Sequence, residues 1–497
     1  MAEKSVIIIG AGIAGLSTGC YARMNGYRTH IFEQHNQPGG VCTAWQRKGY
    51  TIDGCIHWLM GSKPGSSLYR MYEEVGAVQG VRLLIRDHWT CYVDEESGQS
   101  IDVTADLDRL QADLLRLAIE DRALILELMA GVRGVRGFGL SMDKPQELMG
   151  PLDGLKTLWA MLPYMRYLTR YGKPLREFLR PAQSTFLPGV LSTFALPDMP
   201  TFMPFILLSS LAEGSLATIE GGSLRFAQAI EHRYRDLGGE VTYKASVEEI
   251  LVEGDRAVGV RLADGSEHRA DYVVSAADGY STIFKMLGGR YVDARIRERY
   301  ETWLRFDPLV FVDFGVADTL AGRPLEGTLR LARPFTIGER KIDRLGYRLF
   351  RNDPTLAPAG KTVVQSLIPT DYDYWQNLAQ DRSRYEAEKE RVAAAVLERL
   401  EPHLPGLSAH VEMTDVATPC TLERYTRNHR GAFEGWAVSA QNYRTQLSRT
   451  LPGLDNFYMA GQWVQVGGGI PPAVAHGSHI AQILCRRDGK RFQTSRP

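Results

Sequence analysis

The stretch SVIIIGAGIAG, residues 5–15, decides the fold of this chain. Its consecutive β-branched residues, Val6 to Ile9, are typical of a strand buried on both faces in a parallel sheet. Gly10, Gly12 and Gly15 then match the pattern G-x-G-x-x-G, which permits a tight turn, close approach of a pyrophosphate and close packing of the next helix. The stretch therefore predicts a dinucleotide site at the beginning of a helix.

The residues after these glycines extend the pattern into a strand–helix–strand unit. Residues 13–25 are predicted to form the helix whose N-terminal amide groups and dipole hold the phosphates, and Gly26 suits its left-handed end. A second apolar run, RTHIFE (28–33), ends on Glu33, where a carboxylate can bind the hydroxyl groups of a ribose. A glycine-rich turn without a ligand is the alternative, and the helix and the acid together favour the nucleotide.

Further motifs follow the ribose-binding acid. They are QPGG (37–40), GYTIDGCIH (49–57) and the segments 221–224, 247–277 and 459–480. Through these motifs the chain resembles the flavin-dependent phytoene desaturase, carotenoid isomerase and retinol saturase superfamily, which is related more distantly to the amine oxidases. The resemblance spans both ends of the chain and implies FAD as the cofactor, but it does not single out one reaction.

The resemblance also implies which residues contact the cofactor. Three successive glycines end the loop GQWVQVGGG (461–469), and such a loop brings unhindered amide groups to one point before a helix. In the superfamily this loop lies against the ribityl chain and the pyrimidine edge, and the segment containing His57 leads to the isoalloxazine. The cofactor-binding residues expected on this basis are Gly10, Gly12, Ile13, Ala14, Gly15, Glu33, Gln34, Gly39, Gly40, Val41, His57, Val247, Gly461, Gln462, Gly469, Ile470, Pro471 and Ala473.

Length and composition bound the other interpretations. A chain of 497 residues is long enough for two domains, and 44% hydrophobic with 23% charged residues is an ordinary globular composition. Lys plus Arg equals Asp plus Glu at 58 each, which argues against a nucleic-acid partner. Six scattered cysteines without a C-x-x-C pair suit a reduced, cytoplasmic protein. The apolar stretch 186–211 contains prolines that would break a membrane-spanning helix.

The order of strand and helix patterns predicts an α/β fold with two domains. We expect a discontinuous Rossmann-type FAD-binding domain formed by residues 1–75, 221–289 and 451–497. Residues 76–220 and 290–450 are expected to form an inserted substrate domain of mixed α+β type.

One segment of the insert has two interpretations. Several apolar residues fall on one face of a predicted helix, and these are Leu155, Leu158, Trp159, Leu162 and Met165. Basic residues follow as far as Arg180, with Glu177 as the only acid among them. This pattern is typical of a basic amphipathic helix that rests on anionic lipid, and residues 152–180 would then attach a cytoplasmic protein to a membrane. A helix packed on neighbours within the substrate domain gives the same pattern.

Candidate catalytic residues are few, because a flavin supplies the redox chemistry and the protein mainly aligns the substrate with flavin N5. His57 and Trp463 are the candidates, and a packing role for His57 is an equal alternative. Asp53 is expected to have a structural hydrogen-bonding role. His476 and His479 lie three apart on a helix, as two metal ligands could, but no further ligand accompanies them, so no metal site is expected.

The resemblance thus implies an FAD-dependent oxidoreductase that acts on C–C bonds of a hydrophobic polyene such as a carotenoid or retinoid. Desaturation, saturation and isomerisation all stay open, as do the substrate and the oligomeric state. Only one dinucleotide fingerprint is visible, so we expect re-oxidation by oxygen, a quinone or another diffusible acceptor. Two alternatives are a flavin amine oxidase that acts on a C–N bond and a non-catalytic carrier of lipid or prenyl cargo with the fold of the GDP-dissociation inhibitors.

Overall fold

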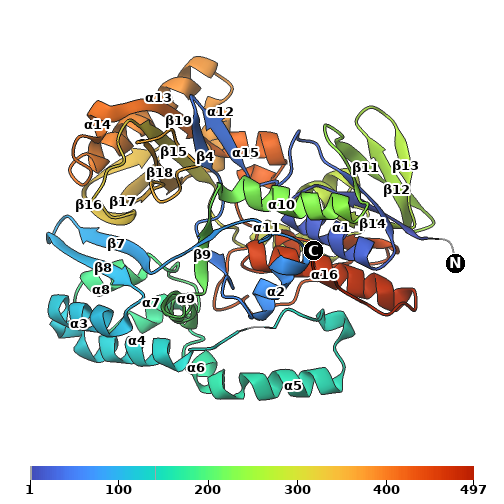
Figure 1. Cartoon of the computed structure of the whole chain (residues 1–497), viewed down its shortest axis with the longest axis horizontal. Coiled ribbons are helices and arrows are strands. Elements are labelled where there is room, and N and C mark those ends of the chain that lie inside the picture. Colours follow the sequence, from blue (N-terminus) through green and yellow to red (C-terminus); the bar gives the residue numbers. More distant parts are fainter. Residues whose placement is uncertain (1–2, 140) are drawn as a thin grey trace.

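The computed structural model describes residues 3–139 and 141–497 and contains two main sheets with helices around them (Figure 1). The first sheet has five parallel strands in the order β10-β2-β1-β14-β20. Its strands are β1 (Ser5–Ile9), β2 (Arg28–Phe32), β10 (Glu240–Thr242), β14 (Tyr272–Ser275) and β20 (Phe457–Met459). Segments from the beginning, the middle and the end of the sequence therefore share one sheet. The Rossmann-type α/β class expected from the sequence is confirmed.

Three helices cover one face of this sheet, and α1 (Ile13–Met24) lies between α10 (Gly222–Asp236) and α16 (Ile470–Arg487). Close contact requires glycine at the crossing of α1 and α16, because a Cβ on Gly477 would lie 2.4 Å from the backbone carbon of Ser17. The other face packs against a small sheet of β11 (Val247–Glu253), β12 (Arg256–Leu262) and β13 (Glu267–Arg269). Because both faces of the parallel sheet are covered, the sequence of its central strand β1 is a continuous apolar run.

The second sheet has seven strands in the order β19-β15-β18-β17-β16-β7-β8. Its strands are β7 (His88–Asp94), β8 (Gln99–Thr104), β15 (Leu309–Val316), β16 (Glu326–Ile337), β17 (Arg340–Leu349), β18 (Thr362–Pro369) and β19 (Val411–Ala417). All neighbouring pairs are antiparallel except β16 and β7. The long helix α13 (Arg382–Leu400) packs its apolar side against this sheet. This mixed sheet is separate from the parallel one.

A helical group packs beside β7 and β8 and forms a core of its own. It contains α3 (Leu107–Leu117), α4 (Arg122–Gly134), α7 (Leu175–Phe178), α8 (Phe186–Leu191) and α9 (Phe202–Ala212). Smaller elements connect these layers, and they are β3 (Ala44–Arg47), β4 (Tyr50–Asp53), β5 (Leu59–Met60), α2 (Ser67–Glu74), β6 (Leu83–Ile85), β9 (Leu216–Ile219), α11 (Ala294–Thr302), α12 (Tyr372–Leu378), α14 (Leu407–His410) and α15 (Pro419–Thr426). Phe202, Phe205 and Leu208 of α9 are buried in the helical core.

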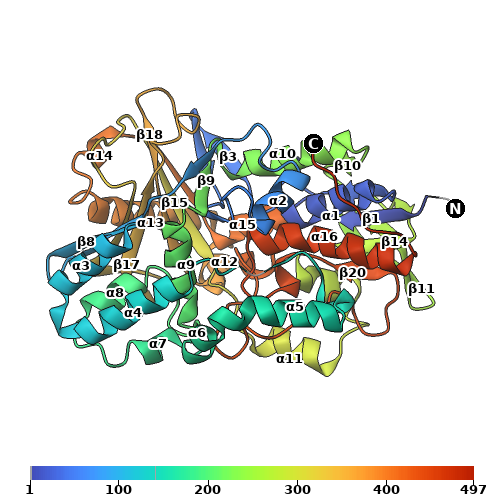
Figure 2. The same cartoon turned by 60° about the horizontal axis from the view of Figure 1, so that its bottom comes forward.

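The helix α5 (Pro151–Met161) lies on the outside of the molecule, followed by α6 (Met165–Arg170) (Figure 2). None of its residues is buried, and the exposed fraction is 75% for Leu152 and 68% for Trp159. The interpretation of this segment as an ordinary packed helix is therefore wrong for α5, because its apolar face has no partner among the described residues. No helix in the described part of the chain combines the length and the apolar character needed to cross a membrane.

Candidate functional site

The glycine turn after β1 brings the beginning of α1 next to the segment 39–40. Gly10 has a φ of +95°, Gly39 has a φ of +113°, and Gly12 forms a parallel bridge with Gly39. A Cβ on Gly15 would lie 2.0 Å from the carbonyl oxygen of Gly10, so only glycine fits there. No side chain caps α1 at Gly12. The first amide groups of this helix are therefore free to bind an anion.

Glu33 follows β2 and lies beside this turn. Its Oε2 accepts a hydrogen bond from the amide of Ala11 at 2.7 Å, and its Oε1 accepts one from the amide of His35 at 2.8 Å. The residue is 7% exposed, and its burial raises the pKa of the carboxyl while these amide bonds oppose the rise. Each carboxylate oxygen keeps a second lone pair, which is what binding to ribose hydroxyls requires. The side chain of Gln34 points elsewhere, toward the carbonyl oxygen of Tyr425 at 2.8 Å.

The glycine-rich loop after β20 reaches the same place from the other end of the sequence. A Cβ on Gly461 would lie 3.4 Å from the Cβ of Ala14, so the loop touches the first turn of α1. The residues 467–469 all have positive φ, and no side chain caps α16 at Gly469. Two uncapped helix N-termini and one carboxylate thus meet at the carboxyl edge of the parallel sheet, where open α/β sheets bind their ligands.

His57 is held by arginines from other parts of the chain. Arg86 donates a hydrogen bond to the carbonyl oxygen of His57 at 2.8 Å, and Arg348 donates one to that of Ile56 at 3.3 Å. Glu326 pairs with both guanidinium groups, at 2.7 and 3.2 Å. Burial and the two guanidinium charges lower the pKa of His57 to about 3. The imidazole is therefore neutral at physiological pH, and its Nε2 is buried without a partner among the described residues.

Two consecutive residues that no sequence motif indicated connect the surroundings of this histidine with the C-terminal loop. The ring of Phe433 stacks on that of His57 with a centroid distance of 6.3 Å. The Cβ of Glu434 lies 3.7 Å from the position that a Cβ on Gly468 would occupy. Residues 433 and 434 therefore lie between the His57 segment and the C-terminal loop. Only the three-dimensional contacts reveal them, because the sequence around them carries no recognised pattern.

Trp463 packs within the protein. Its ring contacts Tyr300 and Trp436 at centroid distances of 6.2 and 5.2 Å, and its carbonyl oxygen accepts a hydrogen bond from Trp436 Nε1 at 3.2 Å. Its own Nε1 is buried and has no partner among the described residues. These contacts therefore give Trp463 a part in shaping the loop.

The other residues singled out in the sequence lie around the same edge. Ile13 and Ala14 begin α1, Ile470, Pro471 and Ala473 lie in the first turn of α16, Val41 and Gly40 follow the bridge at Gly39, Gln462 follows Gly461, and Val247 begins β11. Asp53 is buried and accepts hydrogen bonds from the amides of Ser223 and Cys55 at 3.1 and 3.4 Å.

The two histidines of α16 have protein partners at their ring nitrogens. The Nδ1 of His476 accepts a hydrogen bond from the amide of Gly461 at 3.1 Å. The Nδ1 of His479 accepts one from Arg449 at 3.0 Å, and its Nε2 donates to the carbonyl oxygen of Met142 at 2.7 Å. These contacts fix the loop and the helix to their surroundings.

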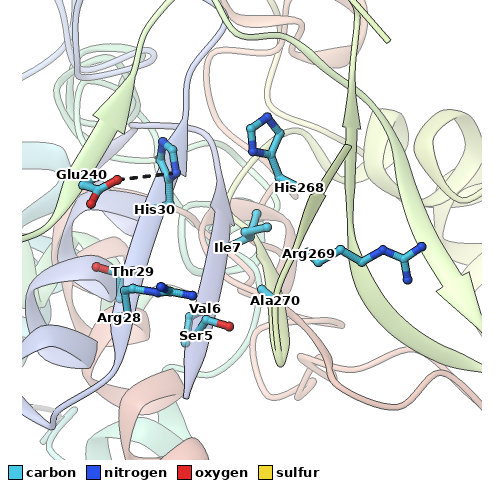
Figure 3. Close-up of a pocket in the computed structure, with 10 residues that line it drawn as sticks. All are labelled: Ser5, Val6, Ile7, Arg28, Thr29, His30, Glu240, His268, Arg269 and Ala270. Carbon is cyan, nitrogen blue, oxygen red and sulfur yellow. Dashed lines mark ion pairs between the residues drawn. The ribbon is translucent and has the colours of Figure 1, made fainter. Parts of the chain in front are cut away.

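A separate pocket of about 240 Å³ lies at the other edge of the parallel sheet (Figure 3). It is lined by the beginnings of β1 and β2, by Glu240 and by residues 268–270. His30 and Glu240 approach each other there at 3.9 Å. Because Gly10 and Glu33 follow the carboxyl ends of β1 and β2, this pocket is distinct from the expected nucleotide site.

Comparisons with known proteins agree with this geometry. Residues 8–75 match the model of an NAD(P)-binding Rossmann-like domain. The chain is 24% identical over 486 residues to a chloroplastic prolycopene isomerase of Arabidopsis thaliana, covering 93% of this chain and 80% of that protein. It is 25% identical over 509 residues to a lycopene-forming phytoene desaturase of Pseudescherichia vulneris, covering 97% and 99% of the two chains. These relatives match the phytoene desaturase and carotenoid isomerase superfamily that the sequence motifs resemble.

Solved structures with the same fold include other oxidases. An oxidoreductase from Methanosarcina mazei has a TM-score of 0.62 and 19% identity, with 97% of this chain and 100% of that chain covered. A putrescine oxidase bound to putrescine has a TM-score of 0.60 and 13% identity, with 98% and 100% covered. These solved structures show that the chain shares its overall fold with oxidases of this kind.

The superfamily implies a flavin cofactor, and the residues at the carboxyl edge of the sheet fit one. The uncapped starts of α1 and α16 offer amide groups to anionic parts of such a molecule, and Glu33 offers acceptors to hydroxyl groups. The Nε2 of His57 and the Nε1 of Trp463 are buried polar atoms that have no hydrogen-bond partner in the part of the chain that the structure describes, as expected beside a bound polar molecule.

Proposed function

We propose that the protein is an FAD-dependent oxidoreductase that acts on carbon–carbon bonds of a hydrophobic polyene such as a carotenoid or retinoid. The observation that carries the proposal is the meeting of the α1 start, Glu33 and the α16 start at one edge of the parallel sheet. The polyene is favoured because sequence relatives that span almost the whole chain are named as carotenoid desaturases and isomerases.

Each part of the site has a defined task in this proposal. The start of α1 holds the pyrophosphate, Glu33 holds the ribose, and the loop 461–469 with the start of α16 lies against the flavin ring. When bound, FAD accepts or gives a hydride at its N5 atom. The dipole of α16 stabilises negative charge that develops on the ring system, and His57 and Phe433 bound the space beside it.

The division into domains follows the same assignment. Residues 1–75, 221–289 and 451–497 would bind FAD, and residues 76–220 and 290–450 would hold the substrate. The single dinucleotide fingerprint at residues 10–15 would bind FAD, which leaves no second fingerprint for NAD(P)H. The reduced flavin would therefore pass its electrons to oxygen, a quinone or another diffusible acceptor.

The visible spectrum of the purified protein tests the cofactor first. We expect a flavin spectrum, bleaching by a polyene substrate without oxygen, and its return with oxygen or a quinone. Glu33→Ala should weaken FAD binding by about 1.5–3 kcal/mol, the contribution of a hydrogen bond to a charged group. A flavin-free protein, a preparation that binds NAD(P)H alone, or an E33A variant that keeps FAD unchanged through dialysis would refute the assignment.

An amine oxidase is the second candidate, because putrescine oxidase shares the fold. The identity of 13% supports the fold alone, and the sequence relatives at 24–25% identity favour the polyene. Bleaching of the flavin by amines but by no polyene would decide for the amine oxidase. The same preparation serves both measurements.

We further propose that α5 places the protein on an anionic membrane surface, from which a polyene is available. Its apolar side chains are exposed, and basic residues from Lys156 to Arg180 outnumber the acids beside them. The double variant Leu158→Glu with Trp159→Glu should lose flotation with phosphatidylglycerol vesicles. Leu304→Glu, an equally exposed leucine elsewhere, is the control. Equal flotation of both variants, or equal binding to phosphatidylcholine vesicles, would refute this contact.

A further inference from the structure

The segment 432–436 runs directly alongside the loop expected to contact the flavin. The amide of Gly467 donates a hydrogen bond to the carbonyl oxygen of Trp436 at 3.0 Å, and residues 436 and 466 form a parallel bridge. A Cβ on Gly435 would lie 2.5 Å from the carbonyl oxygen of Gln462, so the two backbones touch. Glu434 is thereby fixed next to Gly468 by backbone contacts that leave its side chain free.

The carboxylate of Glu434 differs from the other acids around the site. Asp53 accepts two amide hydrogen bonds, Glu33 accepts two, and Asp278 accepts those of Ser281 and His429. Among the described residues, no hydrogen-bond donor and no basic side chain pairs with Glu434. A carboxylate with a structural role is normally hydrogen-bonded within the protein, so the carboxylate of Glu434 is available for a ligand.

The surroundings of Glu434 disfavour the charged form of its carboxyl group. Burial alone raises the pKa of its carboxyl to about 7, and no charged neighbour contributes to the rise. The residue is nevertheless only partly buried, so part of its surface stays accessible to a ligand. The segments packed around residues 432–436 carry other titratable groups. Burial lowers the pKa of His57 to about 3 and that of His429 to about 4, and it raises the pKa of Asp278 to about 6. Arg305, whose segment is bridged to Trp436, has a pKa that burial lowers from its usual value.

We propose that Glu434 is the group that exchanges a proton with the substrate during the redox reaction. The inference rests on the proposed function and adds a residue to it. Glu434 lies between Phe433, which stacks on His57, and Gly468, which belongs to the loop beside the flavin. His57, with a pKa of about 3, holds no extra proton to give at physiological pH and is too weak a base to retain one.

The proton and the electrons balance in the direction of desaturation. One C–H bond of the substrate breaks with its electron pair, and this hydride goes to the oxidised flavin. The C–H bond on the adjacent carbon breaks in the other sense, so its electron pair forms the new C=C bond and its proton goes to the carboxylate of Glu434. Saturation is the reverse, with the protonated carboxyl group as the proton donor. A group that titrates near physiological pH suits both directions.

The test compares Glu434→Gln and Glu434→Asp in the flavin-loaded protein with Glu298→Gln, an exposed acid on α11, as the control. The first readout needs no substrate: the visible flavin band of the native protein is titrated from about pH 5 to 9. We expect a spectral transition near pH 7 in the native protein and in E298Q, and no such transition in E434Q. E434D should retain a transition, because it keeps a carboxylate.

The second readout is the rate at which a polyene reduces the flavin without oxygen. E434Q should be slower by roughly 100- to 10,000-fold at equal flavin content, and E434D should recover part of the rate. A transition that persists in E434Q, or a rate of reduction equal to that of the native protein, would overturn the role of Glu434. These results leave flavin binding intact, whereas a native protein without flavin would overturn the proposed function itself and the inference with it.

Discussion

Alanine at Gly12 and alanine at Gly15 should have opposite effects on the stability of the protein without cofactor. Gly12 has a φ of −69° and a ψ of 175°, which any residue adopts, and an added Cβ would meet nothing closer than 3.8 Å. Replacing such a glycine reduces the freedom of the unfolded chain, so G12A should raise the free energy of unfolding by about 0.4–1 kcal/mol. At Gly15 the added Cβ would lie 2.0 Å from a carbonyl oxygen, so G15A should lose about 1–3 kcal/mol by overpacking.

Both variants should nevertheless bind FAD poorly, for different reasons. The Cβ of G12A would occupy the space through which a pyrophosphate approaches the backbone, and G15A moves the turn itself. Loss of one charge-assisted hydrogen bond, about 1.5–3 kcal/mol, corresponds to roughly 10- to 150-fold weaker binding. Urea denaturation of the apoprotein and fluorescence titration with FAD measure the two quantities separately. A G12A variant that binds FAD like the native protein would refute the position of the pyrophosphate, and one that unfolds at lower urea would refute the steric reasoning.

Three further changes test other parts of the structure. Glu434→Gln should raise the free energy of unfolding of the apoprotein by about 1–2 kcal/mol above pH 7. The pKa of Glu434 is raised from 4.5 to about 7 in the folded state, so the native protein loses stability as the pH rises from 4.5 to 7, and the glutamine variant does not. The full shift is discounted because the side chain is only partly buried, and equal pH profiles of stability for the two proteins would contradict the reasoning. Glu326→Gln should lower the free energy of unfolding by about 3 kcal/mol, because it leaves Arg86 and Arg348 without their shared anion. An unchanged melting temperature would show that this pairing does not stabilise the fold. Gly477→Ala should lower the free energy of unfolding by about 1–3 kcal/mol, because the new Cβ would lie 2.4 Å from the backbone of α1. An unchanged midpoint of urea denaturation would argue against so close a contact between the two helices.

The first strand–helix–strand unit was predictable because its determinants are local. The apolar run of β1, the glycines and Glu33 lie within one short segment, and the structure forms β1, α1 and β2 there. The loop 461–469 was found for the same reason, since consecutive glycines before a helix carry their own signal. The Rossmann-type class and the superfamily followed from these segments.

The rest of the site depends on contacts between distant segments. Arg86, Arg348 and Glu326 come from three places in the sequence, and nothing around any one of them indicates that they meet behind His57. Glu434 is an acid in a segment without a motif, and its isolation from donors is visible only in three dimensions. The sequence of α5 allowed two interpretations, because the same spacing of apolar residues suits a helix that packs on a neighbour and a helix whose apolar face is exposed.

The crossing of α1 and α16 has a consequence for how the protein matures. The helix α1 packs against α16, which begins only at residue 470. The loop that completes the expected nucleotide site directly precedes α16 in the sequence. During synthesis on the ribosome, the glycine turn at residues 10–15 therefore lacks its C-terminal contacts until β20 and α16 have been made. If the protein binds FAD as proposed, a shortened chain that stops before these residues would lack part of the binding site, however well its earlier parts fold.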